Sequence, residues 1–219
     1  GALQAGSEYV NFESWGLDDD YLHAVCEQSQ LGRIRHINLS DNRLTFRGVE
    51  LMGETCGPFW RLESLQLAKN HLQERGGLAV ASLLLDAHPP LRQLDLSDNL
   101  LGDRVCVELC DAVGKACSRL LGLRLVRNKL GRDEQAGLAL GRLVGDLKEL
   151  ELLDLHWNLF HGAGVAALCS GALGSQLRML NLSWNRLGMR CGDRAGAPLS
   201  PRSGGSAPEP AAGAAAAGQ

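Results

Sequence analysis

Aromatic side chains, long apolar runs and an excess of either charge are all scarce in this chain of 219 residues. Aromatic residues make up 5% of it, and the formal net charge is -3 at pH 7. The longest apolar runs, such as LAVASLLL, are too short for a bilayer, which needs about 20 residues. A chain without net basic charge is a poor candidate for general nucleic-acid binding. We therefore expect neither a membrane nor a nucleic-acid partner.

The sequence also lacks the short motifs of common catalytic and metal sites. It has no P-loop, no G-x-S-x-G, no H-E-x-x-H and no C-x-x-C. Asp154 and His156 point the same way on one predicted strand, but alternate strand residues are expected to lie too far apart for proton transfer. We therefore predict a protein that is not an enzyme, with no catalytic residues, no metal, no cofactor and no small-molecule substrate.

The sequence does contain one apolar pattern, L-x-x-L-x-L-x-x-N-x-L, in six copies. The copies span residues 34–44, 62–72, 91–101, 120–130, 150–160 and 177–187. Their asparagines are Asn42, Asn70, Asn99, Asn128, Asn158 and Asn185. Successive asparagines are 27 to 30 residues apart, and this regularity indicates a repeat architecture.

Each copy changes its apolar spacing at the asparagine. Before it, apolar residues alternate with others, as Leu94 and Leu96 do, which is typical of a strand. After it, apolar or small residues recur every four positions, as in Phe160, Gly164 and Leu168, which is typical of one face of a helix. Strands separated by returning helices in units of this length are predicted to run parallel.

These repeats resemble the leucine-rich repeat family, in particular its ribonuclease-inhibitor-like class, whose repeats have about 28–29 residues. The resemblance covers Tyr9 to Leu187, most of the chain. It implies an α/β fold: a right-handed solenoid shaped as a horseshoe arc, with parallel strands on the concave side and helices on the convex side. It also implies a binding scaffold.

We expect three segments along the chain. Residues 1–30 form a degenerate first repeat or N-terminal cap, with Trp15 in the place of the asparagine. Residues 31–187 form the repeats. Residues 188–219 are rich in Gly, Ala and Pro, have no spaced leucines and are expected to be disordered.

The six motif asparagines are expected to be structural. The chain turns sharply after each strand, and the turn frees N–H and C=O groups that no sheet can satisfy. A buried polar group without a partner costs about 1–3 kcal/mol, and an Asn side chain offers both donors and an acceptor. We therefore predict a ladder of asparagines that bond the turns of their own and neighbouring repeats.

Four of the seven cysteines follow the repeat. Cys26, Cys110 and Cys169 lie eleven residues after the asparagine position, and Cys106 lies seven after it. We interpret them as small residues buried against the next coil. A metal or redox site at Cys106 and Cys110 is the alternative, but it needs further ligands. The odd count, without a disulfide pattern, suits a reducing compartment, so we expect the cytoplasm or the nucleus.

Candidate binding residues follow from the strand register. Trp157 and Trp184 occupy the same register in adjacent repeats, at the end of the strand where the surface is open. Exposed tryptophans are typical of interaction hot spots. The alternative is that the two indoles pack on each other and shield the poorly capped last repeat. The full candidate set is Trp157, Trp184, Arg124, Arg127, Asp154, His156, Asp95 and Asp98.

The function predicted from these features is binding of a protein partner through the concave face, as an adaptor, inhibitor or sensor. Two alternatives stay open. One is activation of GTP hydrolysis by a small GTPase, resembling the Ran GTPase activators, and the other is a detached sensor domain of a larger receptor. The last repeat lacks a returning helix and a polar cap, so self-association through it is a further expectation.

Overall fold

The computed structural model describes residues 8–28, 33–56 and 61–188, in which strands and helices alternate. The strands are β1 (Tyr9–Asn11), β2 (His36–Asn38), β3 (Ser64–Gln66), β4 (Gln93–Asp95), β5 (Gly122–Arg124), β6 (Leu152–Asp154) and β7 (Met179–Asn181). The helices are α1 (Asp19–Gln28), α2 (Phe46–Cys56), α3 (Gln73–Ala87), α4 (Asp103–Ala116), α5 (Glu134–Asp146) and α6 (Gly162–Leu173). Of the predicted tail, residues 188–219, all but residue 188 lie outside the described residues.

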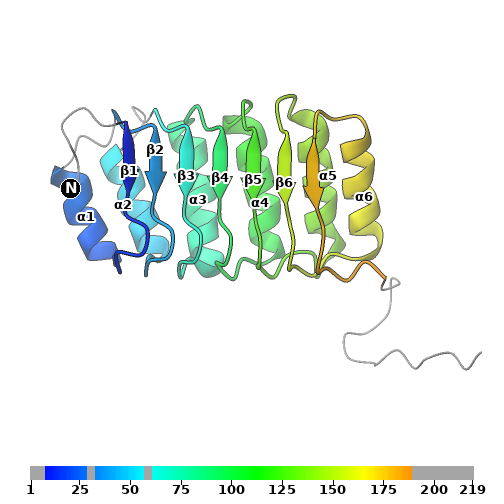
Figure 1. The fold of residues 1–219 in the computed structure, drawn as a ribbon, viewed down its shortest axis with the longest axis horizontal. Helices are drawn as coiled ribbons and strands as arrows, with labels where there is room; N and C mark the ends of the chain where they lie inside the picture. The colour runs from blue at the N-terminus through cyan, green and yellow to red at the C-terminus, as the bar shows by residue number, and fades with distance from the viewer. Residues whose placement is uncertain (1–7, 29–32, 57–60, 189–219) are drawn as a thin grey trace, which may run out of the picture.

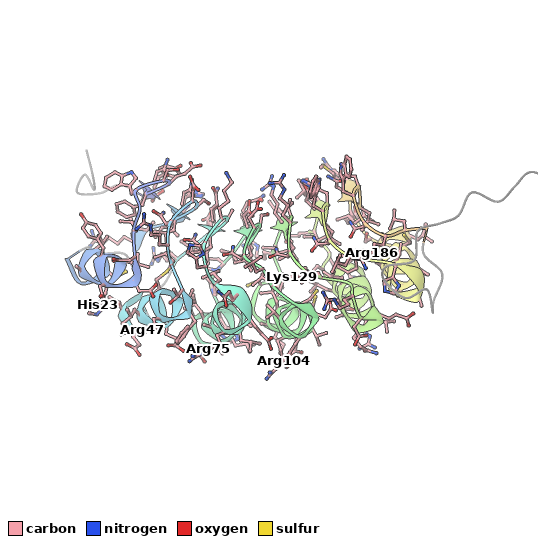
Figure 2. All side chains as sticks on the ribbon, turned by 90° about the horizontal axis from the view of Figure 1, so that it is seen from below. His23, Arg47, Arg75, Arg104, Lys129 and Arg186 are labelled. Atoms are coloured by element: carbon pink, nitrogen blue, oxygen red, sulfur yellow. The ribbon has the colours of Figure 1, made fainter. Side chains whose placement is uncertain are left out.

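The seven strands form one parallel sheet in chain order. Equivalent residues pair: Leu94 of β4 lies opposite Leu65 on one side and Leu123 on the other. Figure 1 shows the open sheet in front of a layer of helices. In the end-on view of Figure 2 the helices follow the outer side of a shallow arc, and the labelled Arg47, Arg75 and Arg104 point away from the strands. The predicted leucine-rich-repeat solenoid is confirmed.

The core is a stack of layers, one for each repeat. In the fourth strand's repeat, Leu94, Leu96 and Leu101 from the strand side meet Leu109 and Val113 from α4, and all five are buried. Full burial of such a side chain contributes about 1.5–3 kcal/mol. Strands pack about 4.8 Å apart, whereas packed helices need about 8–10 Å. The helical side is therefore the longer one, and the stack bends toward the strands.

The motif asparagines join each turn to the repeat before it. Asn99 is fully buried, and its side-chain amide donates to the carbonyls of Leu67, Leu96 and Ser97 at 2.8, 3.2 and 2.9 Å. Its side-chain oxygen accepts from the backbone N–H of Asn70 at 3.2 Å. The other five asparagines donate to the same kinds of carbonyl. The side-chain amide therefore provides hydrogen-bond partners for backbone C=O and N–H groups of the turn, which have no partner in the sheet.

Cys26, Cys106 and Cys110 are buried and form no disulfide, as predicted, and the same holds for Cys117. The prediction for Cys169 is wrong, because this thiol is exposed on α6. Its position in the repeat is the one that Cys110 occupies on α4, where α5 covers it. Among the described residues no helix follows α6, so nothing covers Cys169.

The asparagine ladder makes a testable prediction for Asn99. Replacing it with alanine leaves the buried N–H of Asn70 without an acceptor, because within the described residues that N–H donates to the Asn99 side chain alone. We expect Asn99→Ala to lower the free energy of unfolding by about 1–3 kcal/mol in urea denaturation. Asn185→Ala is the matched control at the open end, where the side chain is half-buried and water can replace it. Equal losses in the two variants would contradict the role of burial.

Candidate functional site

At the end of every strand the chain turns through one residue in the left-handed backbone region. These residues have φ between 51° and 59° and are Ser14, Asp41, Lys69, Asp98, Arg127, Trp157 and Trp184. Non-glycine residues adopt this region uncommonly, and Asn and Asp tolerate it best. The ladder imposes it here, since the next residue is the anchored asparagine or, in the first repeat, Trp15. The side chain at this turn is exposed or half-buried, at the edge of the concave face.

Two of these turns carry tryptophan, and the two indoles touch. The ring centroids of Trp157 and Trp184 lie 5.3 Å apart, with 36° between the ring planes. Trp157 is 46% exposed, and Trp184 is 74% exposed. The contact between the rings therefore leaves most of Trp184 open to solvent.

Side-chain contacts connect the two indoles to the equivalent turn residues of the two preceding repeats. The guanidinium of Arg127 lies over the Trp157 ring, 4.8 Å from its centroid, within the range of a cation–π interaction. Arg127 Nη1 also lies 3.9 Å from Asp98 Oδ1. Asp98, Arg127, Trp157 and Trp184 thus form a continuous ridge along the carboxyl edge of the sheet, which we call the tryptophan ridge.

Asp154 and His156 lie beside this ridge on the concave face, and they are in contact. His156 Nδ1 is 2.9 Å from Asp154 Oδ1, so the expectation that alternate strand residues stay too far apart is wrong here. The contact forms because the strand ends at Asp154 and the chain begins to turn. Asn181 Nδ2 of the next strand lies 3.4 Å from the same imidazole nitrogen. Among the described residues no Ser, Thr or Cys side chain is hydrogen-bonded to His156, so the pair orients an imidazole without activating a nucleophile.

Arg124 lies between two carboxylates in the register of the sheet, with Asp95 on one neighbouring strand and Asp154 on the other. Within the described part of the chain, Arg124 makes no ion pair or side-chain hydrogen bond. The oxygen Oδ1 of Asp95 accepts from the backbone N–H of Ser97, and Asp154 holds His156. Within the described residues the guanidinium donors of Arg124 are therefore unpaired.

Two apolar residues of the same surface do not stand out in the sequence. Leu152 and Met179 lie opposite each other at the start of β6 and β7. Met179 is exposed and Leu152 is half-buried. Their position precedes the central strand leucine, and side-chain alternation along the strand is the signal that places them on the concave face. They extend the apolar part of the surface below the tryptophans.

The early repeats carry a different surface, a hollow of about 570 Å³ at the carboxyl edge of the sheet. Asp41 and Asp98 line it together with Arg43, Lys69 and Leu100. The basic side chains alternate with the carboxylates, so the charge of this hollow is mixed.

The described residues do not form a metal site, a membrane span or a reactive thiol at Cys106 or Cys117. In residues 8–28, 33–56 and 61–188 no group of three His, Cys, Asp or Glu side chains is placed to hold a metal ion. None of the helices in these ranges has the length and apolar character to span a bilayer. The hydrogen-bonded Cys110 thiol and burial raise the pKa of the Cys106 thiol well above its usual range. Burial also raises the pKa of Cys117 to about 12, so both thiols are poor nucleophiles.

Comparison with known proteins agrees with this fold. No protein-family model matches the chain. The human NACHT, LRR and PYD domains-containing protein 5 is 31% identical over 161 residues, which are 73% of this chain and 13% of that protein. The mouse ribonuclease inhibitor is 31% identical over 144 residues, 65% of this chain and 31% of the inhibitor. A crystal structure of the Arabidopsis receptor kinase HAESA with a peptide hormone and a co-receptor matches 77% of this chain and 27% of that chain, with 23% identity and a TM-score of 0.42.

The repeats, the parallel sheet and the asparagine ladder define the class: the chain is a leucine-rich repeat protein. Its repeats belong to the ribonuclease-inhibitor-like class, to which its sequence relatives also point. The chain spans about a third or less of the length of these relatives.

A substitution at the left-handed turn of Trp184 tests whether this indole is available to bind a partner or instead caps the solenoid. Asn tolerates this backbone better than Trp does, and little Trp184 surface is buried. We expect Trp184→Asn to leave the free energy of unfolding within about 0.5 kcal/mol of the wild type, or to raise it. Phe160→Ala, which removes a buried ring, is the control and should cost about 3–5 kcal/mol. A loss above about 2 kcal/mol for Trp184→Asn, outside the range of exposed sites, would show that the indole caps the solenoid.

The cysteines make a second prediction. At mildly alkaline pH a thiol-alkylating reagent should label Cys169 in the native protein and leave Cys106 and Cys117 unlabelled, because only an accessible thiolate reacts. In denaturant, all three cysteines should be labelled to the same extent. Peptide mapping by mass spectrometry reads out each site separately, and equal native labelling of Cys106 and Cys169 would contradict the burial.

Proposed function

We propose that this chain is a protein-binding module and that its partner contacts the tryptophan ridge together with Arg124, Asp154 and His156. The observation that carries this proposal is the pair of exposed tryptophans at left-handed turns in consecutive repeats. Backbone strain of this kind costs about 1–3 kcal/mol at each residue. Aspartate or asparagine would reduce that cost at the same turn.

Packing within the chain does not offset the strain at Trp184. A buried Trp contributes strongly through its large apolar area, but about three quarters of this side chain is exposed. A partner that covers both indoles would recover that area. Tryptophan and arginine are also the residue types enriched among binding hot spots. Leu152 and Met179 provide further apolar surface beside the indoles.

The polar groups around the indoles determine what the partner must offer. Arg124 has free guanidinium donors, and its planar fork suits a carboxylate or another planar acceptor. His156 is held by Asp154 through Nδ1, which leaves Nε2 for the partner. A fitting partner therefore presents an apolar pocket for the tryptophans beside an acidic or carbonyl-rich patch for Arg124. Asp95 and Asp98 would act at the rim, where charge steers the encounter more than it adds affinity.

The relatives support binding of a protein by this fold. The ribonuclease inhibitors are named for the inhibition of another protein, and 31% identity extends over most of this chain. The multidomain relative supports a second candidate function, a sensing segment of a larger receptor, because its matching part is 13% of its length. An immunoblot of cell extracts for a longer product that contains this sequence separates the two candidates.

We also propose a reducing location, the cytosol or the nucleus. The buried free thiols in the described residues support it, since free buried cysteines are typical of such compartments. Self-association, which the sequence predicts for the last repeat, would use a different surface: the outer side of α6 and β7.

Affinity capture tests the binding proposal. Proteins retained from a cell extract by the wild-type chain should be reduced roughly tenfold or more on the Trp157→Ala/Trp184→Ala double variant, as expected when two hot-spot residues are truncated. Quantitative mass spectrometry measures the retained proteins. The melting temperature of the double variant should stay close to that of the wild type.

Trp15→Ala is the matched control, because Trp15 is an exposed tryptophan of the first repeat, 52% accessible, far from the ridge. It should retain the same proteins as the wild type. Arg124→Ala should reduce retention by a smaller factor. Unchanged capture by the double variant would overturn the proposal.

A further inference from the structure

The last helix leaves exposed two positions that are buried in other helices of the solenoid. Leu143 of α5 lies fifteen residues after its motif asparagine and is 4% exposed. Leu173 of α6 lies at the same position after Asn158 and is 90% exposed. Cys110 and Cys169 show the same contrast at the eleventh position. The outer side of α6 therefore presents the surface that receives the next helix elsewhere in the solenoid. Figure 1 shows α6 at the end of the helix layer.

The sheet also ends in an uncovered edge, at its last strand. The backbone N–H groups of Leu155 and Trp157 donate to the carbonyls of Asn181 and Ser183, at 2.9 and 3.0 Å. The equivalent donors of the last repeat are the N–H groups of Leu182 and Trp184. Within residues 8–28, 33–56 and 61–188 these two donors have no acceptor. An open strand edge with free donors is a template for pairing with another chain.

The charge of this end identifies the occupant. Helix α6, GAGVAALCSGAL, contains no charged residue, whereas each of the other five helices contains at least three. Two copies of an uncharged face can meet without repulsion. The opposite end of the molecule is less suitable, because α1 carries the exposed carboxylate of Asp20. A head-to-tail contact that buried this carboxylate against an apolar helix would be costly.

We propose that the outer face of α6 and the edge of β7 form a docking surface for a second copy of this chain. A two-fold axis perpendicular to the sheet places β7 antiparallel to its counterpart and α6 beside its counterpart. The free N–H groups of Leu182 and Trp184, directly after β7, then have carbonyl groups of the second copy as acceptors. The two Leu173 side chains are covered in the interface, as Leu143 is covered within one chain.

The packing of α5 on α6 shows that small residues suit this kind of contact. A Cβ atom at Gly141 or Gly171 would collide with the backbone of the facing helix, so the two helices approach to backbone contact. The solvent side of α6 also lacks bulk, with Ala163, Ala166 and Ser170 exposed. A helix with this surface can approach its symmetry mate closely.

Sedimentation velocity of the full 219-residue chain tests the proposal. The wild type should form a dimer that dissociates on dilution. Leu173→Glu places a like charge on both sides of the axis and should leave a monomer at all concentrations. Because Leu173 is almost fully exposed, this variant should keep the circular dichroism spectrum and the melting temperature of the wild type.

Val107→Glu is the matched control, since Val107 is an exposed apolar residue of α4. This variant should dimerise like the wild type. A monomeric wild type would overturn the proposal, and so would a dimer that persists in Leu173→Glu. A bis-maleimide cross-link between two copies of Cys169, in a chain with Cys56→Ser and Cys191→Ser, provides a second readout that Cys169→Ser should abolish. Leu173→Glu leaves both tryptophans in place, so this variant should still capture the partner, which separates a failure of this proposal from a failure of the binding proposal.

Discussion

The hydrogen bonds from each motif asparagine to the turn of the preceding repeat are the constraint on which the rest of this structure depends. A coil of fewer than thirty residues cannot bury its own apolar face or satisfy its own turn. Asn99 bonds carbonyls of both its own coil and the one before, and its oxygen accepts a backbone N–H from that earlier coil. Leucine layers supply the apolar energy of the stack, while the amides determine how one coil is placed on the next.

The same constraint creates the candidate binding surface. Because the asparagine is anchored inside, the residue before it is forced into the left-handed region with its side chain at the carboxyl edge of the sheet. Seven such residues stand in one row, and their identity is free of any packing requirement. In the early repeats the row carries Asp and Lys. In the last two it carries Trp157 and Trp184, so the scaffold holds a rigid aromatic surface at the cost of some backbone strain.

The repeat principle also explains why the two ends of the molecule differ from its middle. Each coil is stabilised by both of its neighbours, so a terminal coil keeps one apolar face uncovered. At the first repeat, Trp15 replaces the asparagine and packs edge-on against Phe12, with ring centroids 5.2 Å apart. At the last repeat the described residues show no such cover, and Leu173, Met179 and Leu187 are exposed. Exposed apolar faces of this kind are typical of interaction sites.

Most of the fold could be predicted from the sequence, because period, strand alternation and helical spacing are local properties that a repeated unit restates six times. The neighbour relation between Trp157 and Trp184 followed from the same register. The exposure of Cys169 and the contact of His156 with Asp154 could not be predicted, because the first depends on whether another helix follows and the second on how a strand leaves the sheet. All four residues of the tryptophan ridge were candidates from the sequence, but the contacts that join them were not predicted. The sequence by itself determined the coil and its place in the series. Only the tertiary structure decided which faces are covered, since burial depends on the neighbour that a coil meets and not on the coil alone.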